Sequence, residues 1–265
     1  MVTKIGLLGD VHGNANTVLS ALRKFSREGV THILQLGDFG FWPGTHGQTF
    51  LTYVNKLLTK NGQYLYVTPG NHEDYHQIYD FQQINRDGWV VARAHILIAP
   101  RGHRWSWEGV SFVSLGGAPS VDRKWRVENE KAGRRKSWWM EEAITEKDIM
   151  KTIAGGHADV MVAHDAPYGV PKIEKYIGPN PHGFHQDDLD YALKGRKDML
   201  TVVDIVRPKV FIHGHYHIRV DDTLEIFNEN TGLDDTVRIF GLNSDGNAGT
   251  SGILTLPGLS TEFLN

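Results

Sequence analysis

Leu7-Leu8-Gly9-Asp10-Val11-His12-Gly13-Asn14 carries an apolar run directly into a carboxylate and an imidazole. The run continues Lys4-Ile5-Gly6, so we predict a strand that ends in a tight turn. Asp10 and His12 are two residues apart, which on an extended backbone places both side chains on the same side. Taken alone, this pattern predicts either a metal site or a solvated turn with a hydrogen-bonded histidine.

The composition is that of a globular protein without cysteine chemistry. A chain of 265 residues with 40% hydrophobic and 22% charged residues is long enough for one large α/β domain. The net charge of −3 gives no general reason to expect nucleic-acid binding, although a local basic patch stays compatible with it. With no cysteine, any metal must use oxygen and nitrogen ligands, for which 14 histidines are available. The first residues form a predicted strand, and no apolar run approaches ~20 residues, so we expect a cytoplasmic protein without a membrane partner.

Two further strands repeat the opening arrangement. A helix is expected over residues 16–27, and residues 31–36 form a strand that runs into Gly37-Asp38. A strand, a helix and a strand over so short a distance make a βαβ unit, so the strands should be parallel and should end at the same sheet edge. After a second helix, a third strand over residues 64–67 delivers Gly70-Asn71-His72-Glu73. A solvated turn explains one such case but explains three in succession poorly.

The second half of the chain predicts further strands and helices. Three short runs over residues 95–115 resemble an antiparallel meander, and Thr145 with Asp148 resembles a capping box at a helix start. Residues 168–186 are expected to form a long loop. Two more predicted strands end on polar side chains, at His164 and at His213-Gly214-His215. Without internal repeats, we expect one domain over residues 1–265, with an insertion or cap around residues 119–140.

Five strand ends thus present seven candidate metal ligands, namely Asp10, His12, Asp38, Asn71, His164, His213 and His215. Carboxylate, amide and imidazole groups suit Mn²⁺, Fe or Zn²⁺. Seven groups are too many for one ion and about right for two. A bridging carboxylate, for which Asp38 is the natural candidate, would hold two ions ~3.5–4 Å apart.

These blocks resemble the calcineurin-like metallophosphoesterase superfamily, whose pattern is D-x-H, GD, GNH[DE], an isolated H, and GHxH. The matching blocks span residues 10–215 in the family's order, and they are Gly9-Asp10-Val11-His12-Gly13, Gly37-Asp38, Gly70-Asn71-His72-Glu73, Ala163-His164 and Gly214-His215, preceded by His213. The resemblance implies an α/β fold of four layers, in which two mixed β-sheets are flanked by helices. It places the metal site at the carboxyl-terminal edge of the strands.

The resemblance also implies a ligand assignment and a mechanism. One metal ion would be held by Asp10, His12, Asp38 and His215, and the other by Asp38, Asn71, His164 and His213. His217 lies beyond the expected motif, and we predict a surface histidine there. His72 would face the substrate and act as the catalytic residue, oriented by Asp10 or by Glu73. A metal-bridging hydroxide would attack phosphorus, with two divalent ions, Mn²⁺ before Fe or Zn²⁺, as cofactors.

Differences from the family pattern bear on the substrate. The second block continues as Phe39-Gly40-Phe41-Trp42, without the arginine with which relatives that act on phosphoproteins grip a phosphomonoester. Phe41 and Trp42 either line a site for a flat apolar group or simply pack. Arg123 and Arg126 in the insertion either contact phosphate or lie on a solvated surface.

The sequence therefore favours a phosphodiesterase that acts on small substrates, such as cyclic nucleotides or nucleotide-like diesters. A phosphomonoesterase, a nuclease and a non-catalytic metal-binding scaffold are the alternatives. No separate nucleic-acid-binding domain is visible, which weighs against a nuclease. All the motif residues are present, which weighs against a scaffold. The sequence leaves the oligomeric state open.

Overall fold

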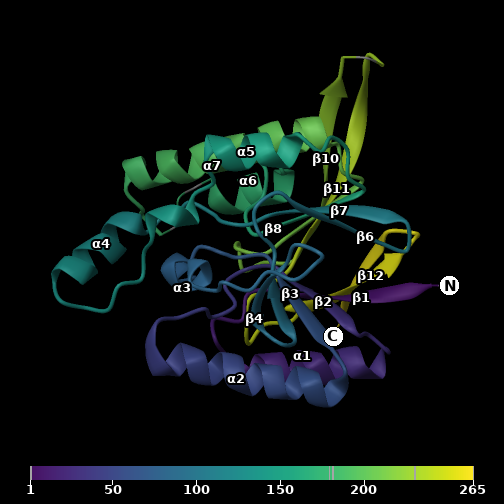
Figure 1. The fold of residues 1–265 in the computed structure, drawn as a ribbon. Coiled ribbons are helices and arrows are strands. Elements are labelled where there is room, and N and C mark those ends of the chain that lie inside the picture. The colour runs from purple at the N-terminus through teal and green to yellow at the C-terminus, as the bar shows by residue number, and fades with distance from the viewer. Residues whose placement is uncertain (1, 179, 181, 230, 265) are drawn as a thin grey trace.

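The computed structural model describes residues 2–178, 180, 182–229 and 231–264. Two mixed β-sheets face one another, and helices cover the outer face of each sheet (Figure 1). The predicted four-layer α/β architecture is thereby confirmed.

The first sheet contains the strands that carry the opening motifs. Its strand order is β13-β12-β1-β2-β3-β5-β4. The bounds are β1 (Thr3–Leu8), β2 (His32–Gln35), β3 (Tyr64–Val67), β4 (Val90–Arg93), β5 (Ile96–Ile98), β12 (Ser251–Leu256) and β13 (Ser260–Leu264). Strands β1, β2 and β3 are parallel, as predicted, so the loops that follow them meet at one edge.

Two helices, α1 (Ala15–Arg27) and α2 (Gly44–Asn61), cover the outer face of this sheet (Figure 1). Helix α1 begins where the side chain of Asn14 accepts hydrogen bonds from the backbone N–H groups of Asn16 and Thr17. Its apolar stripe includes Leu22 and Phe25, which are fully buried against the sheet. The turn that carries Asp10 and His12 is therefore held between a buried strand and a capped helix.

The second sheet supplies the other motif residues. Its strand order is β10-β11-β9-β8-β7-β6, and β7, β8, β9 and β11 are parallel. The bounds are β6 (His103–Trp107), β7 (Val110–Leu115), β8 (Val160–Ala163), β9 (Val210–His213), β10 (Val220–Asn228) and β11 (Leu233–Gly241). Helices α5 (Glu146–Ile153), α6 (Pro171–Ile177) and α7 (Gln186–Val206) cover its outer face (Figure 1). The capping box of Thr145 and Asp148 is present at the start of α5.

Apolar side chains fill the space between the two sheets. Leu7, Leu34, Phe112, Val162 and Ile212 belong to this inner core, and each is at most 1% exposed. Burial on this scale fixes the two sheets against one another and thereby fixes the relative position of their strand ends. Among the described residues, no helix is both long and apolar enough to cross a membrane.

The structure differs from the expected secondary structure in two places. The predicted meander over residues 95–115 is wrong, because β5 pairs with β3 and β4 in the first sheet whereas β6 and β7 form a hairpin in the second. Short apolar runs fit either sheet, and only the tertiary pairing separates them. The predicted loop over residues 168–186 contains helix α6, which begins at Pro171 as the first helical residue. Positions 179 and 181 of that loop lie outside the described residues.

The expected insertion lies near the edge where the parallel strands end. It contains helix α4 (Arg123–Lys131) and is followed by a short 3₁₀ helix (Met140–Glu142). Helix α3 (Tyr75–Tyr79) follows the third motif at the same side of the molecule (Figure 1). Unlike the α-helices that cover the two sheets, α3 and α4 do not lie on an outer sheet face (Figure 1).

Candidate metal centre

Strand ends from both sheets bring the motif side chains together. The carboxylate or ring-nitrogen atoms of Asp10, His12, Asp38 and His217 all lie within 4.8 Å of one another. His12, Asp38 and His215 each adopt a positive φ angle, of 43°, 51° and 70°. Side chains other than glycine rarely adopt this conformation, and such strain gathers at functional sites. The backbone is therefore bent at these three positions in order to present the side chains.

Glycines beside the ligand candidates allow this close approach. A Cβ atom at Gly37 would lie 2.2 Å from Nδ1 of His164, and one at Gly214 would lie 2.2 Å from Oδ1 of Asp10. Any side chain at these two positions would displace a candidate ligand. The glycine in each motif is thus required by packing at the cluster.

The first half of the cluster consists of Asp10, His12, Asp38 and His217. Nε2 of His12 lies 3.5 Å from Oδ2 of Asp38, and Nε2 of His217 lies 3.1 Å from Oδ2 of Asp10. The other ring nitrogen of His12, Nδ1, lies 3.0 Å from Oδ1 of Asp245. Burial lowers the pKa of His12, but hydrogen bonding to Asp38 and the charges of Asp38 and Asp10 outweigh it and raise the pKa to about 9.

The second half of the cluster consists of Asp38, Asn71, His164 and His215. Nε2 of His164 lies 2.9 Å from Oδ1 of Asn71 and 3.4 Å from Oδ1 of Asp38. The ring centroids of His164 and His215 are 5.0 Å apart. Burial lowers the pKa of His164, but the charge of Asp38 and its hydrogen bond raise the pKa to about 10. Asp38 is common to both halves, and although burial opposes its ionisation, His72 and His164 hold its pKa well below the usual range.

The orientation of the donor atoms in the second half fits a bound divalent metal ion. Nδ1 of His164 lies 2.6 Å from the carbonyl oxygen of Leu36, which orients the ring so that Nε2 faces the cluster. The amide nitrogen of Asn71 donates to Oγ of Ser120, which leaves the amide oxygen facing the same point. An imidazole nitrogen, an amide oxygen and a carboxylate oxygen thus converge. Together these groups form an oxygen and nitrogen donor set for a divalent metal, which would take the place of the proton that the raised pKa of His164 keeps on its ring.

The structure does not bring His213 to this cluster. Its Nδ1 lies 2.8 Å from the carbonyl oxygen of Gly214. Its Nε2 has no hydrogen-bond partner among the described residues and lies so close to Gly241 that a Cβ atom there would be 2.6 Å away. Burial lowers the pKa of His213 to about 4, so the ring is neutral. His213 is the last residue of β9, and its side chain is enclosed by the second sheet instead of facing the strand edge.

His217 is the residue that sequence reasoning missed. The expected surface position is confirmed, since the side chain is 44% exposed, but the ring also contacts Asp10, and its centroid lies 5.0 Å from that of His12. The histidine that lies with Asp10, His12 and Asp38 is thus His217 and not the expected His215, and His215 lies beside His164, where His213 was expected. The signal was present in Gly214-His215-Tyr216-His217, which matches the family's GHxH block without using His213.

His72 lies beside the cluster and contacts an arginine. Nη2 of Arg126 is 2.7 Å from Nε2 of His72, and Nε2 of His72 is 3.8 Å from Oδ2 of Asp38. Burial lowers the pKa of His72 to about 4; the charge of Asp38 opposes this shift, and the charge of Arg126 adds to it. Arg126 thus places a positive charge directly beside His72.

Neither residue expected to orient His72 does so. The carboxylate of Glu73 accepts hydrogen bonds from the backbone N–H groups of Asp38, Phe39, Gly40 and Gly70, at 2.6–3.1 Å. Burial and the neighbouring charge of Asp38 raise the pKa of Glu73 to about 7. Asp10 accepts the backbone N–H of His215 instead. Glu73 therefore ties the second and third motif loops together.

The two arginines of the insertion have different positions. Arg126 is 5% exposed, and its Nε lies 2.8 Å from Oδ1 of Asp122. Arg123 lies away from the cluster, where Nε donates to Asp188 at 3.1 Å and the guanidinium lies 4.3 Å from the ring centroid of Tyr191. Arg123 therefore anchors α4 on α7, and only Arg126 is at the candidate site.

The two aromatic residues of the second loop also differ. Phe41 is fully buried in the outer core, where its ring packs on Phe39 and Phe81, so it lines no substrate site. Trp42 is partly exposed and lies against Gly13, where a Cβ atom would be 2.7 Å from the indole ring. Trp42 thus borders the turn that carries His12, and it is the aromatic residue that remains a candidate for substrate contact.

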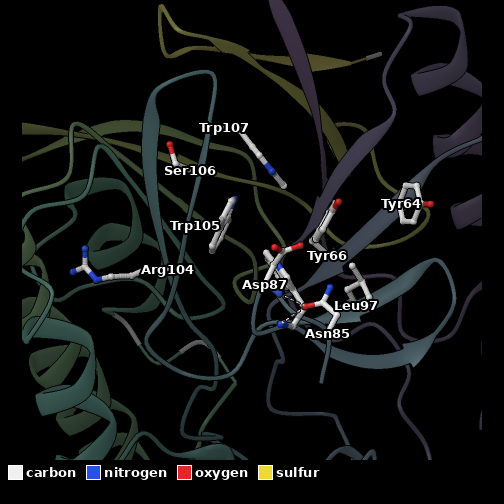
Figure 2. A pocket seen from close by; sticks show the side chains of 10 residues that line it. Tyr64, Tyr66, Asn85, Asp87, Leu97, Arg104, Trp105, Ser106 and Trp107 are labelled. Carbon is white, nitrogen blue, oxygen red and sulfur yellow. Dashed lines mark hydrogen bonds between the residues drawn. The ribbon is translucent and has the colours of Figure 1, made fainter. Parts of the chain in front are cut away.

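A pocket of about 590 Å³ lies elsewhere, between the edges of the two sheets (Figure 2). Its aromatic lining comes from Tyr64, Tyr66, Trp89, Trp105 and Trp107. Tyr64 begins β3, whereas the candidate ligands follow the end of that strand, so the pocket is distant from the cluster along the sheet. Its lining includes none of the candidate metal ligands.

Comparisons with known proteins agree with the fold. A family model described as calcineurin-like phosphoesterase matches residues 3–219. A solved structure, TT1561 of Thermus thermophilus, has 10% identity and a TM-score of 0.54, with 100% of this chain and 99% of that chain covered. The structure of a dimetal phosphatase from Danio rerio has 14% identity and a TM-score of 0.51, with 96% and 95% covered. A search among curated proteins found no match.

Proposed function

The chain belongs to the calcineurin-like phosphoesterase family, and from this premise we propose that it hydrolyses small phosphodiesters with two divalent metal ions. Metal-dependent phosphoester hydrolysis is the activity of the family. The observation that carries the proposal for this chain is the convergence of imidazole, amide and carboxylate donor atoms around Asp38. Cyclic nucleotides and nucleotide-like diesters are the substrates that we propose.

We assign the ligands by the two halves of the cluster. Asp10, His12, Asp38 and His217 would hold one ion, and Asp38, Asn71, His164 and His215 the other. Two divalent ions there would supply a nucleophile from water at neutral pH and neutralise charge on the phosphoryl oxygens. We propose Mn²⁺ as the ion, with Fe or Zn²⁺ as alternatives, because the donors are oxygen and nitrogen atoms.

The chain's own residues would position the phosphoryl group and stabilise its charge. The guanidinium of Arg126 lies against His72 at the side of the cluster, so a phosphate bound there would meet a fixed positive charge. Charge-assisted hydrogen bonds of this type strengthen as negative charge develops on the phosphoryl oxygens in the transition state. His72 would donate a hydrogen bond to an oxygen of the same group. We further propose that residues 119–140 cap the site, because they carry Arg126.

Two observations bear on the substrate class. The partly exposed ring of Trp42 beside the His12 turn supports a diester with a flat apolar substituent. Arg126 supports a second candidate, a phosphomonoester, because a guanidinium binds the additional free oxygen of a terminal phosphate well. The motif loop lacks an arginine, but α4 brings one to the cluster from another part of the chain.

The experiment measures hydrolysis of an aryl phosphodiester and an aryl phosphomonoester by metal-stripped protein before and after Mn²⁺ is returned. We expect activity that requires the metal, is higher with the diester and is strongly reduced in His72→Ala. Preference for the monoester would favour the second candidate. Bound metal without hydrolysis of either ester would contradict both and favour a non-catalytic scaffold.

A further inference from the structure

We propose that Asp245 is a positioning residue for the metal site, because its carboxylate orients the imidazole of His12. The proposal rests on the proposed function, since it concerns the ligands of that same site. Asp245 lies in the loop between β11 and β12, 233 residues from His12 and outside the residues 3–219 that match the family model. The family motifs therefore do not account for it.

Both oxygens of Asp245 contact the turn that follows β1. Oδ1 lies 3.0 Å from Nδ1 of His12, and Oδ2 accepts a hydrogen bond from the side-chain nitrogen of Asn14 at 3.1 Å. The side-chain oxygen of Asn14 in turn caps α1. One carboxylate thus connects the candidate ligand to the start of the helix behind it.

The loop that carries Asp245 is held against the metal-binding edge. The backbone N–H of Gly9 donates to the carbonyl of Thr250 at 2.8 Å, and the loop packs so closely that a Cβ atom at Gly9 would lie 2.3 Å from the carbonyl oxygen of Asn243. Inside the loop, the hydroxyl of Thr250 donates to the carbonyls of Ser244 and Asn247. Asp245 is therefore presented by an ordered loop that is bonded next to Asp10.

The contact determines which nitrogen of His12 faces the cluster. A carboxylate accepts a proton-bearing nitrogen, so Nδ1 of His12 carries a hydrogen, and Nε2 is the nitrogen that faces Asp38 and would bind a metal ion. His164 is oriented in the same sense by the backbone carbonyl of Leu36. The two imidazoles thus share one arrangement, but only His12 depends on a side chain that a mutation can remove.

Titration of the metal-free, full-length protein with Mn²⁺ alone, followed by calorimetry, tests the proposal. We expect two ions per chain in the wild type. In Asp245→Ala, one of the two should bind about 10- to 100-fold more weakly, the range found when such partners of metal ligands are removed. Asp245→Asn, which keeps an acceptor for Nδ1 without the charge, should show a smaller loss at the same position.

Two further variants separate this role from a general structural one. Asn14→Ala removes the second contact of Asp245 but keeps the first, so it should retain both ions with little change. Asp234→Asn alters an exposed carboxylate in the preceding strand and should behave as the wild type. A thermal melt of each variant verifies folding.

The outcomes distinguish this inference from the proposed function. Equal weakening of both ions in Asp245→Ala, or binding unchanged from the wild type, would overturn the positioning role alone. A wild-type protein that binds no divalent ion would overturn the proposed function and this inference with it. Selective loss of one ion, with the other retained, is the result that the structure predicts.

Discussion

The two halves of the donor cluster share Asp38 but differ in their access to solvent. In one half, His164 is fully buried and Asn71 is 2% exposed. In the other half, the side chains of His12 and His217 are 23% and 44% exposed. Similar donor groups thus lie in the protein interior in one half and at the protein surface in the other. Under the proposed function, the open half is therefore the side from which we expect water and substrate to reach the site.

The insertion explains why one half is enclosed. Oγ of Ser120 accepts the amide nitrogen of Asn71 at 2.9 Å and donates to the buried carboxylate of Glu142 at 2.6 Å. Glu142 also accepts the indole N–H of Trp138. Burial raises the pKa of Glu142 to about 7. These contacts cover the Asn71 side of the cluster, whereas Trp42 and the loop that carries Asp245 lie at the His12 side.

The largest effect is expected where the two halves join. Asp38→Asn removes the carboxylate that both halves share, so we predict the loss of both metal ions and a fall in activity of about 1000-fold or more. Calorimetric Mn²⁺ titration and ester hydrolysis measure the two effects. Retention of one tightly bound ion in this variant would show that the halves are independent.

The role of the covering insertion is tested by its two arginines. Arg126→Gln removes the positive charge beside His72, and we predict a fall in kcat/KM of about 100-fold with metal binding unchanged. The matched variant Arg123→Gln loosens α4 from α7 without removing a group at the site, so its effect should be far smaller. Equal losses in the two variants would assign Arg126 a structural role only.

A chelator should remove the ions of the two halves at different rates. Because His12 and His217 are accessible to solvent and His164 is not, a chelator should extract one ion quickly and the other slowly. Release of Mn²⁺ from the loaded protein, followed after mixing with excess chelator, should therefore show two phases. A Ser120→Ala variant should accelerate the slow phase. A single phase would contradict the difference in access that the structure shows.

A small effect is expected from the aromatic border of the open half. Trp42→Ala should lower kcat/KM for an aryl diester several-fold without loss of metal, because the indole borders the His12 turn at Gly13 and offers no metal-binding atom. Phe41→Ala is the matched control, since it creates a cavity in the core and should destabilise the fold by about 3–5 kcal/mol. Chemical denaturation and ester kinetics measure both variants. The assignment of Trp42 to the substrate side of the site is contradicted if folded Phe41→Ala protein loses more activity than Trp42→Ala.

Much of the site was accessible from the sequence, because it depends on strand ends. Asp38 and Asn71 each follow a short apolar strand, and parallel strands within one sheet must end at the same edge. The position of His213 was not accessible in this way. It is still part of β9, and the positive φ angles of His215 and His217 decide which histidines turn towards the cluster.

Other parts of the site depend on contacts that no local pattern records. Phe41 stands in a loop rich in glycine and aromatic residues, but it is buried because α2 starts immediately after that loop and covers it. Arg126 lies 54 residues along the chain from its partner His72. Asp245 lies 233 residues from its partner His12. Spacing in the sequence predicts the ligands of a strand edge well, but it does not predict what packs over that edge.

The most direct test of the account compares His217→Ala with His213→Ala. Both variants remove one histidine from the same segment, but the structure places only His217 at the donor cluster. We predict that His217→Ala weakens one of two Mn²⁺ ions and strongly reduces phosphoester hydrolysis, whereas His213→Ala retains two ions and activity in the folded protein. Loss of an ion in His213→Ala, with normal binding in His217→Ala, would contradict the account.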